Sequence, residues 1–550
     1  MLYAGGGTLV YLKSVARTSI FEYDEVAFLP YYSVGMDRKQ NRERYLGKQR
    51  NNNDFKNYFM ASNFVISELL DIKKNKKFDK SQLIELSKIM TSMKNTFEKY
   101  GKFPRESYKT VGKLFPEGWV SSMDAPRIMV ASRMLYELTK DEQWNDFVKK
   151  LSVYVVKDIS EGGFSLKVAE GVWPLEYAKN NITYDESLFV LNGSLTGYLA
   201  LYMMSEVDKD LGLDVYLRSV EQVYEKMFSK FYYENENFLW AKYMLHPPTV
   251  IPPHYMIYEK ELFGALASVT GKDLFRREYK KLVHCLESVL KPQFKRVGSK
   301  VYFIIRRACP PHPYLIDCFP TRIEFYDNEG KRINQPYING SKNMTNKDLQ
   351  GFKAGEFLYG EVPENAMAYS YYRNDTGELL FKKDIVDTDF IKENDATQDL
   401  SFNLITINDA KLINDKKVLI SGGLSEKTEA TLICKLKNIE KLDMSCLYGI
   451  ELENLSSMKL YMGLCLYDTD KKGTTRYYTP LNPGKNLVLF NIIGFPSIDK
   501  LKNFQRIDIR IYTNDSNTEG LCKMGKILRF RDMFALREYR KHSKYEISLQ

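Results

Sequence analysis

Residues 81–100, SQLIELSKIMTSMKNTFEKY, decide how the first half of the chain is interpreted. Their apolar side chains recur at steps of three and four residues, which is the period of one face of an α-helix. The members of this stripe are Leu83, Leu86, Ile89, Met90, Met93 and Phe97. The stretch therefore predicts an amphipathic helix that packs through one apolar face.

The same helical period extends from about residue 53 to 292. It predicts about eight helices, the others lying at roughly 53–72, 122–139, 141–157, 185–205, 211–232, 256–270 and 272–290. Short polar turns such as Thr139-Lys140-Asp141 join most of them, and short connections make sequential helices antiparallel neighbours. Because the helices carry no heptads, we expect an α/α hairpin toroid, or partial α/α barrel, over residues 51–295, after an N-terminal extension over 1–50.

From about residue 297 the apolar period changes to two, which is typical of strands. Stretches such as VYFIIRR and RIEFYDNEG predict a small β domain over 296–390, and the acidic stretch 385–399 forms the junction to a second β block. That block, over 400–540, has the strand spacing of a β-sandwich, with carbohydrate binding as a candidate role. The predicted fold class is therefore a multidomain α + β protein, in which a helical toroid precedes two β-rich domains.

One strand of the second β block illustrates the pattern. In RIDIRIYTND, starting at Arg506, the residues Ile507, Ile509 and Ile511 alternate with Asp508 and Arg510. Alternation of this kind predicts a strand that buries one face.

The composition limits the classes of function. The 550 residues carry 80 Lys and Arg against 70 Asp and Glu, a formal net charge of +10, and they are 44% hydrophobic and 27% charged, which excludes disorder, collagen and coiled coil. The basic residues are scattered, so nucleic-acid binding is not indicated, whereas a modestly basic surface suits an acidic polysaccharide.

The 5 His leave little room for a His-built metal centre, so we expect no metal and no cofactor. The 39 Tyr favour proton transfer without imidazole, although half-buried strand tyrosines are the commoner explanation.

The cysteines and the N-terminus bear on location. The 7 Cys are odd in number and form no Cys-x-x-Cys pair, which is typical of reduced thiols in a cytosolic chain. Cys309 and Cys318 bracket a proline-rich stretch with one His, but zinc is not favoured because a second ligand pair is missing. Since no signal peptide or transmembrane segment is evident, we expect a bacterial cytoplasmic protein, and a homodimer stays open.

Three stretches of the helical block concentrate unusual aromatic and polar residues. GVWPLEYAKNNITYDESLFVLNG at 171–193 presents a Trp, a Glu and a Tyr just before a helix. WAKYMLHPPTVIPPHY at 240–255 is proline-rich, so it must pass over a helix end before it delivers aromatic hydroxyls to the next helix. FPEGWVSSMD at 115–124 predicts a Gly-Trp turn ahead of a helix. Packing aromatics and a solvated loop carboxylate are the alternative explanation of the first stretch.

At these three places the sequence resembles the C-terminal catalytic domain of the D-glucuronyl C5-epimerases, over about residues 100–292. The family's Gly-Trp-Tyr-Ser-Ala-Met is similar to Gly118-Trp119-Val120-Ser121-Ser122-Met123, and its Trp-x-Glu-Glu-Tyr-Pro loop is similar to Trp173-Pro174-Leu175-Glu176-Tyr177-Ala178. Its Phe-Val-Leu-Asn-Gly helix start matches Phe189-Val190-Leu191-Asn192-Gly193, and its aromatic approach to the penultimate helix is similar to His254-Tyr255.

Members of that family invert C5 of glucuronate in heparosan-type polymers. The resemblance implies an isomerase, a polysaccharide uronyl C5-epimerase that converts D-glucuronate to L-iduronate. It also implies Glu176, Tyr177 and Tyr255 as the proton-transferring catalytic residues. The chain departs from the family where Trp240 and Tyr243 replace a Tyr followed three positions later by Arg. It departs again at Ala125-Pro126-Arg127, where the family has Gln-Gly-Gln.

The chemistry itself asks for these residue types. The C5 proton of a uronate lies α to a carboxylate, so inversion needs a base on one face of the ring and an acid on the other. Tyrosine is a poor base at neutral pH but a competent acid toward a carbanion, whereas a carboxylate can serve as base or relay. General acid–base catalysis accelerates a reaction by about 10²–10⁴-fold, which is too little on its own to form the carboxylate-stabilised dianion. A cation must therefore neutralise the substrate carboxylate. The predicted substrate-binding residues are Trp119, Trp173, Asn192, Trp240 and Tyr243, with Arg105, Arg127 and Lys242 as the candidate cations.

Two other functions stay open at this point. A polysaccharide lyase shares the proton abstraction at C5 and differs in the fate of the C4–O4 bond. A catalytically silent carbohydrate-binding protein is the other alternative, and the departures at Trp240 and Tyr243 support it.

Overall fold

The structure is a computed structural model of the chain. It describes residues 17–24, 27–28, 38–46, 57–75, 80–110, 113–235, 238–251, 253–290, 292–306, 321–333, 337–339, 357–373, 377, 379–386, 390–391, 397–407, 410–414, 417–420, 430–441, 446–457, 459–467, 479–490, 503–512, 520–531 and 533–549. Cys309 and Cys318, which the sequence raised as metal-ligand candidates, lie outside these residues.

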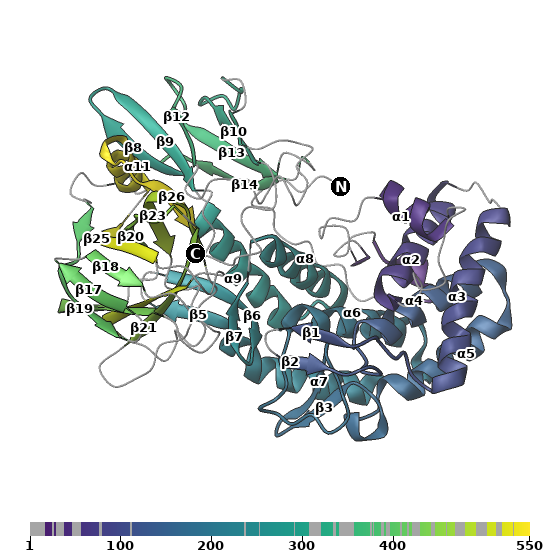
Figure 1. Ribbon diagram of the computed structural model, residues 1–550. Helices are drawn as coiled ribbons and strands as arrows, with labels where there is room; N and C mark the ends of the chain where they lie inside the picture. The colour runs from purple at the N-terminus through teal and green to yellow at the C-terminus, as the bar shows by residue number, and fades with distance from the viewer. Residues whose placement is uncertain are drawn as a thin grey trace. The chain divides into compact units, whose positions relative to one another are not determined.

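The chain divides into two compact units (Figure 1). One, here called the helical unit, comprises Thr8–Tyr232 and Ala241–His284. The other, the strand-rich unit, comprises Met1–Gly7, Tyr233–Trp240 and Cys285–Gln550. A helical region followed by many strands confirms the predicted mixed α + β class.

The helices of the first unit fall close to the predicted ranges. They are α1 (Arg38–Leu46), α2 (Tyr58–Asn75), α3 (Lys80–Tyr100), α4 (Asp124–Thr139), α5 (Glu142–Val155), α6 (Leu191–Val207), α7 (Asp214–Met227), α8 (Pro253–Thr270) and α9 (Asp273–Leu290). Short strands punctuate them: β1 (Tyr108–Thr110), β2 (Lys113–Phe115), β3 (Ser165–Val168), β4 (Gly171–Pro174), β5 (Tyr232–Asn235), β6 (Phe238–Leu245) and β7 (Pro248–Val250). Short 3₁₀ helices lie at Ile20–Glu22, Ile159–Glu161, Lys209–Leu211 and Phe228–Phe231.

Local chemistry explains several of these boundaries. The stripe on α3 is confirmed, since Leu83, Leu86, Ile89, Met90 and Met93 are all buried. The α5 helix begins after Asp141, whose carboxylate accepts a hydrogen bond from the Gln143 N–H at 3.2 Å, and such a cap satisfies an otherwise unpaired donor. The α8 helix begins at Pro253, a position where a missing N–H costs nothing.

Alternate helices of the unit pack on one another in succession. Helix α2 contacts α4, α4 contacts α6, and α6 contacts α8, while α3, α5 and α7 pack against their sequence neighbours. The α6 helix is buried on nearly every side, which fits its near-absence of charged residues. The site described below is built around α4, α6 and α8.

The predicted start of the helix at 185 is wrong, because α6 begins at Leu191. Phe189 has a φ of 50°, a left-handed conformation that interrupts an α-helix. The carbonyl of Leu188 accepts hydrogen bonds from the N–H groups of Leu245 and His246 at 3.1 and 3.3 Å, so the chain is tied to the end of β6 before the helix starts.

The strand-rich unit contains four larger sheets. Three strands, β8 (Gln293–Val297), β9 (Lys300–Arg306) and β12 (Phe357–Glu361), form one sheet in the order β12-β9-β8, and β10 (Thr321–Tyr326), β11 (Tyr337–Asn339), β13 (Ala368–Arg373) and β14 (Leu379–Asp384) form another in the order β11-β10-β13-β14. A seven-stranded sheet runs β17-β18-β25-β20-β23-β26, with β15 paired to β25, and a five-stranded sheet runs β16-β19-β24-β21-β22.

The bounds of the strands in the two last sheets are β15 (Gln398–Asp399), β16 (Phe402–Ile407), β17 (Ala410–Asn414), β18 (Lys417–Ile420), β19 (Ala430–Lys441), β20 (Leu447–Asn454), β21 (Leu460–Tyr467), β22 (Thr479–Leu481), β23 (Gly484–Phe490), β24 (Asn503–Tyr512), β25 (Gly520–Phe530) and β26 (Glu546–Leu549). Helix α11 (Met533–His542) follows β25.

Strand β24 confirms one half of its predicted pattern. Ile507, Ile509 and Ile511 are all 0% exposed, as the alternation predicts. Asp508 was expected on the exposed face, but it is buried as well. The guanidinium of Arg506 donates two hydrogen bonds of 2.6 Å to its carboxylate, which explains how the charge is accommodated.

Candidate active site

Backbone pairing fixes the loop that carries Glu176 and Tyr177. The N–H and C=O of Ala178 exchange hydrogen bonds of 2.9 Å with those of Val120, and the Ser122 N–H donates to the Leu175 carbonyl at 2.9 Å. The turn ahead of α4 and the loop after β4 therefore form one short ladder. Glu176 and Tyr177 lie between its two paired ends, so neither can shift without breaking these bonds.

Gly193 in the first turn of α6 lies directly against Glu176. A Cβ placed on Gly193 would lie 2.5 Å from the Glu176 Cβ and would also overlap its carboxyl oxygen. The Ser122 hydroxyl donates to the Gly193 carbonyl at 3.1 Å, and a Cβ on Gly197 would lie 2.5 Å from the Ser122 carbonyl oxygen. Two glycines four residues apart thus let the loops rest on the helix backbone.

Burial raises the pKa of the Glu176 carboxyl to about 7. A hydrogen bond from Tyr177, the positive charge of Arg105 and a backbone hydrogen bond from Gly193 oppose the rise, while the charge of Asp124 adds to it. The residue keeps part of its surface exposed, but its Oε2 is buried. A carboxyl that titrates near neutral pH can both take and return a proton.

Tyr177 lies within a group of aromatic rings. Its ring stacks on Trp119 at 5.2 Å and on Tyr108 at 5.9 Å, and lies 5.2 Å from Phe115. Burial first, and then the neighbouring Glu176, raise the pKa of its hydroxyl above the ordinary range. Tyr177 is therefore a neutral phenol beside Glu176.

Arg105 brings a positive charge to this group. Its Nε and Nη2 donate to Asp124 in the first turn of α4 at 2.8 and 2.5 Å, and its guanidinium lies 5.1 Å over the ring of Trp119. Burial alone would lower the pKa of Arg105, but the charge and hydrogen bonds of Asp124 outweigh it and the pKa is raised. The charges of Glu176 and Tyr177 act in the same direction, which places the guanidinium near both.

Tyr243 and Tyr255 complete the group. Tyr243 comes from β6 and Tyr255 from the first turn of α8, with ring centroids 5.2 Å apart at 63°. Burial first, and then Glu176, Tyr177, Tyr255 and Glu259, raise the pKa of Tyr243 well above its usual value. We call Arg105, Glu176, Tyr177, Tyr243 and Tyr255 the acid–base cluster; it lies within the helical unit.

Other residues predicted from the sequence lie elsewhere. Trp173 is 0% exposed, and its ring stacks on Phe231 at 5.7 Å. Trp240 is also 0% exposed and belongs to the strand-rich unit. Both indole side chains are enclosed by protein atoms, as the packing alternative for Trp173 expects.

Two candidate cations and one amide are also buried. Arg127 is 0% exposed and its Nε donates to the side chain of Asn63 at 2.8 Å. Lys242 is 7% exposed and its Nζ donates to the Lys230 carbonyl at 3.0 Å. Asn192 is 3% exposed in the first turn of α6. Arg105, the third predicted cation, interacts electrostatically with both Glu176 and Tyr177.

Sequence reasoning missed four contributors: Asp124, Gly193, Tyr108 and Glu259. The spacing of Gly193 and Gly197 was a usable signal, since glycines four apart on a helix mark a close approach. No sequence signal pointed to Asp124 or Glu259, because the role of each depends on partners that are distant in sequence.

No metal site competes with this cluster in the described part of the chain. Among those residues, no three His, Cys, Asp or Glu side chains are grouped to hold an ion. The described cysteines are buried and form no disulfide; they are Cys285, Cys434, Cys446, Cys465 and Cys522. Across the same residues, no helix is both long and apolar enough to cross a membrane.

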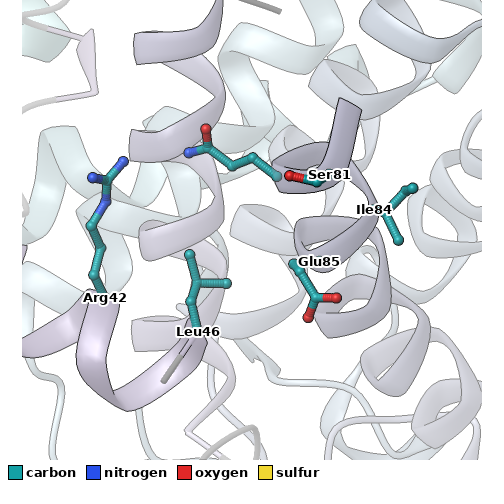
Figure 2. Close-up of a pocket in the computed structure, with 6 residues that line it drawn as sticks. Arg42, Leu46, Ser81, Ile84 and Glu85 are labelled. Atoms are coloured by element: carbon teal, nitrogen blue, oxygen red, sulfur yellow. The ribbon is translucent and has the colours of Figure 1, made fainter. Parts of the chain in front are cut away.

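Two pockets lie away from the cluster and share no residue with it. Figure 2 shows the first, where side chains of α1 and α3 line a space of about 480 Å³; they are Arg42, Leu46, Ser81, Gln82, Ile84 and Glu85. Arg42 and Gln82 both bind the buried carboxylate of Glu68, at 2.6 and 2.7 Å, so their polar groups already have partners. The second, in the strand-rich unit, includes Glu451, Lys485, Tyr539 and Tyr545.

Comparison with known proteins shows which family the helical unit resembles. Residues 65–284 match the family model described as D-glucuronyl C5-epimerase C-terminus. The resemblance inferred from the three motifs is thereby confirmed. This segment is therefore similar to an epimerase family, whose members are isomerases.

Whole-chain comparisons add little. No curated protein matches the sequence. Among solved structures, PfGH50B is 14% identical over 25% of this chain and 24% of that one, with a TM-score of 0.21. CtCBM11 is 9% identical over 26% of this chain and 98% of that one, with a TM-score of 0.19. Scores this low carry no argument about fold or function.

The close approach at Gly193 makes a first prediction. Gly193→Ala should lower the free energy of unfolding by about 1–3 kcal/mol, because the added methyl would overlap Glu176 in a packed site. Gly264→Ala is the matched control, since its Cβ would meet only the ring of Tyr279 at 3.3 Å. Urea unfolding measures both, and a Gly193→Ala protein as stable as the control would contradict the contact.

The raised pKa of Glu176 makes a second prediction. The Glu176 carboxyl binds its proton more tightly in the folded state than in the unfolded chain. Its contribution to the free energy of unfolding is therefore fully present below pH 4.5 and is lost as the pH rises through about 7. The loss is on the order of 3 kcal/mol. Glu176→Gln should remove this part of the decline, as measured by unfolding between pH 4.5 and 8. An unchanged pH profile in the variant would be inconsistent with a buried, titrating Glu176.

Proposed function

We propose that the protein is a polysaccharide uronyl C5-epimerase, which inverts C5 of D-glucuronate in a heparosan-like polymer to give L-iduronate. The observation that carries the proposal is the convergence of Glu176, Tyr177 and Tyr255, with Arg105 beside them, inside the segment that matches the epimerase family. A base, an acid and a cation are what inversion at a carbon α to a carboxylate requires.

Tyr177 and Glu176 act together as the base. As the phenol oxygen of Tyr177 takes the C5 proton, its own hydroxyl proton passes to the neighbouring Glu176, with which it interacts electrostatically. A carboxyl with a pKa of about 7 is a stronger base than an ordinary glutamate, and about half of it is ionised at neutral pH. Tyr255 donates its hydroxyl proton to the opposite face of C5 and completes the inversion.

Arg105 neutralises the substrate carboxylate. Inversion passes through a carbanion conjugated with that carboxylate, so the transition state carries more negative charge than the substrate. The Arg105 side chain is 22% exposed, and Asp124 holds it in place through Nε and Nη2. Trp119, below the guanidinium, and Tyr243, beside Tyr255, are the proposed sugar-contacting surfaces.

The architecture proposed for the whole chain has four parts: an extension over 1–50, an α/α toroid over 51–295, a small β domain over 296–390 and a β-sandwich over 400–540 that binds carbohydrate. The successive packing of α2, α4, α6 and α8 supports the toroid, since helices that alternate in sequence line the inside of such a ring. The seven-stranded sheet, antiparallel apart from its β23–β26 pair, and the antiparallel five-stranded sheet support the sandwich.

Removal of the acid or base should abolish exchange at C5. Tyr255→Phe and Glu176→Gln are each expected to reduce deuterium incorporation at C5 of a heparosan-type polymer in D₂O by about 10²-fold or more, because each removes a proton-transfer group. Tyr154→Phe is the matched control: this buried tyrosine of α5 also has a raised pKa but interacts with Phe97 and Phe103 instead of the cluster.

Retained exchange in both variants would refute the site assignment. An unsaturated uronate product, detected by its absorbance, would identify a lyase in place of an epimerase. Binding of the polymer without any exchange in the wild type would identify a silent carbohydrate-binding protein.

Loss of the Arg105 charge should weaken transition-state binding more than substrate binding. Arg105→Gln is expected to lower kcat/KM by about 10²-fold, mostly through kcat, because the extra charge develops at the carbanion. Arg133→Gln is the control, since Arg133 is also partly buried and pairs with Glu137 at 2.9 Å. An equal effect of the two substitutions would show that Arg105 contributes only to folding.

A further inference from the structure

Glu259 is a buried acid that the proposed chemistry has not yet used. It lies on α8, one turn after Tyr255, and is 0% exposed. Within the described residues, neither of its carboxyl oxygens has a hydrogen-bond partner. An isolated carboxylate in such a position costs several kcal/mol, so the group stays neutral. Burial first, and then the charge of Glu176, raise its pKa well above the usual value.

Two other buried acids, Glu68 and Asp124, have partners, and of Glu176 only Oε2 is buried without one. Glu68 is bound by Arg42 and Gln82, and Asp124 is bound by Arg105. A buried carboxyl with both oxygens unsatisfied is uncommon in folded proteins and marks a functional position when it adjoins other titrating groups. Glu259 therefore requires an explanation beyond packing.

The groups that face Glu259 belong to the acid–base cluster. Glu176 from the loop after β4 and Tyr243 from β6 both interact with it electrostatically. Tyr255 precedes it by one turn on the same face of α8. On the α6 side, the adjacent Tyr258 hydroxyl lies 3.0 Å from the Thr196 hydroxyl and holds the helix in register. Glu259 thus interacts electrostatically with the base side of the cluster through Glu176 and comes one helical turn after Tyr255 on the acid side.

An epimerase has to reset itself after every inversion. The base has gained a proton and the acid has lost one, so the site returns to its starting state only when a proton crosses from one side to the other. Where the groups are buried, solvent exchange is slow, and an internal chain of titratable groups shortens the path.

We propose that Glu259 is a proton-relay residue, which returns the proton from Glu176 to Tyr255 after each inversion. This inference rests on the proposed function. Glu176 gives its proton to Glu259, Glu259 gives one to Tyr243, and Tyr243 gives its hydroxyl proton to the phenolate of Tyr255. One proton moves in total, and Glu259 and Tyr243 end in the state in which they began. Each transfer needs the Glu259 side chain to turn toward its neighbour, which its unpaired oxygens permit.

Kinetics separate a relay from a structural role. Glu259→Gln should keep single-turnover inversion in D₂O within about threefold of wild type, while steady-state turnover falls more than about tenfold, because chemistry survives and reset does not. The control is Glu278→Gln, a buried acid of α9 that is 3% exposed, has a raised pKa and lies 3.8 Å from Lys281. It should leave both rates unchanged.

Two kinetic outcomes would overturn the relay: a steady-state rate of Glu259→Gln equal to that of the control, or single-turnover and steady-state rates that fall together. Glu259→Asp guards against misfolding, because it keeps a carboxyl and should restore part of the steady-state rate. A failure of Glu259→Asp to exceed Glu259→Gln would also count against the relay.

Infrared spectroscopy tests the same idea without activity. At neutral pH the wild type should show the carbonyl band of a neutral carboxylic acid that Glu259→Gln lacks and that Glu176→Gln shifts. If Glu259→Gln removes no such band, or if Glu176→Gln leaves it in place, the two carboxyls do not share a proton and the relay is wrong. A wild type that shows the coupled band but inverts no glucuronate polymer would support proton sharing and refute the proposed function.

Discussion

The contact between the Glu176 side chain and the backbone of Gly193 constrains the rest of the site. No other residue than glycine fits there, and the loop can rest on α6 only because Gly197 makes a second close approach one turn later. The backbone hydrogen bonds between residues 120–122 and 175–178 then hold the Glu176 carboxyl in its position against α6. These short distances shield the Glu176 carboxyl from water, and the rise in its pKa follows from that shielding.

Charge in the helical unit is organised around this buried carboxyl. Arg105 is the cation beside it, and Asp124 holds the guanidinium in position and keeps it charged. The phenols of Tyr177 and Tyr243 stay neutral because burial opposes their ionisation. These facts are consistent with an acid–base site that lacks imidazole. A carboxyl with a pKa near neutral pH can accept a proton and several neutral phenols can donate one, which are the two roles that a histidine would otherwise fill.

The sequence predicted the regular parts well and the long-range parts poorly. The stripe on α3 and the isoleucines of β24 follow from periodicity alone, and the structure buries both. Periodicity placed the start of α6 too early, at 185, because Phe189 adopts a left-handed conformation while Leu188 binds the end of β6, whereas the motif at 189–193 matched a helix start. Motif resemblance brought Glu176, Tyr177 and Tyr255 together, but it also included Trp173, whose burial against Phe231 depends on a segment far away in the chain. Asp508 escaped prediction for the same reason as Glu259: a buried acid is recognisable only from its surroundings.

The order in which the cluster's residues occur along the chain has a consequence for folding. Arg105, Glu176, Tyr243 and Tyr255 come from four separate segments, and the contacts among them close long loops. Contacts of this kind form late, because the chain loses loop entropy before it gains their energy. The helices can therefore reach nearly native content while the acid–base cluster is still open, and catalytic competence would be the last property to appear on refolding and the first to vanish under mild denaturant.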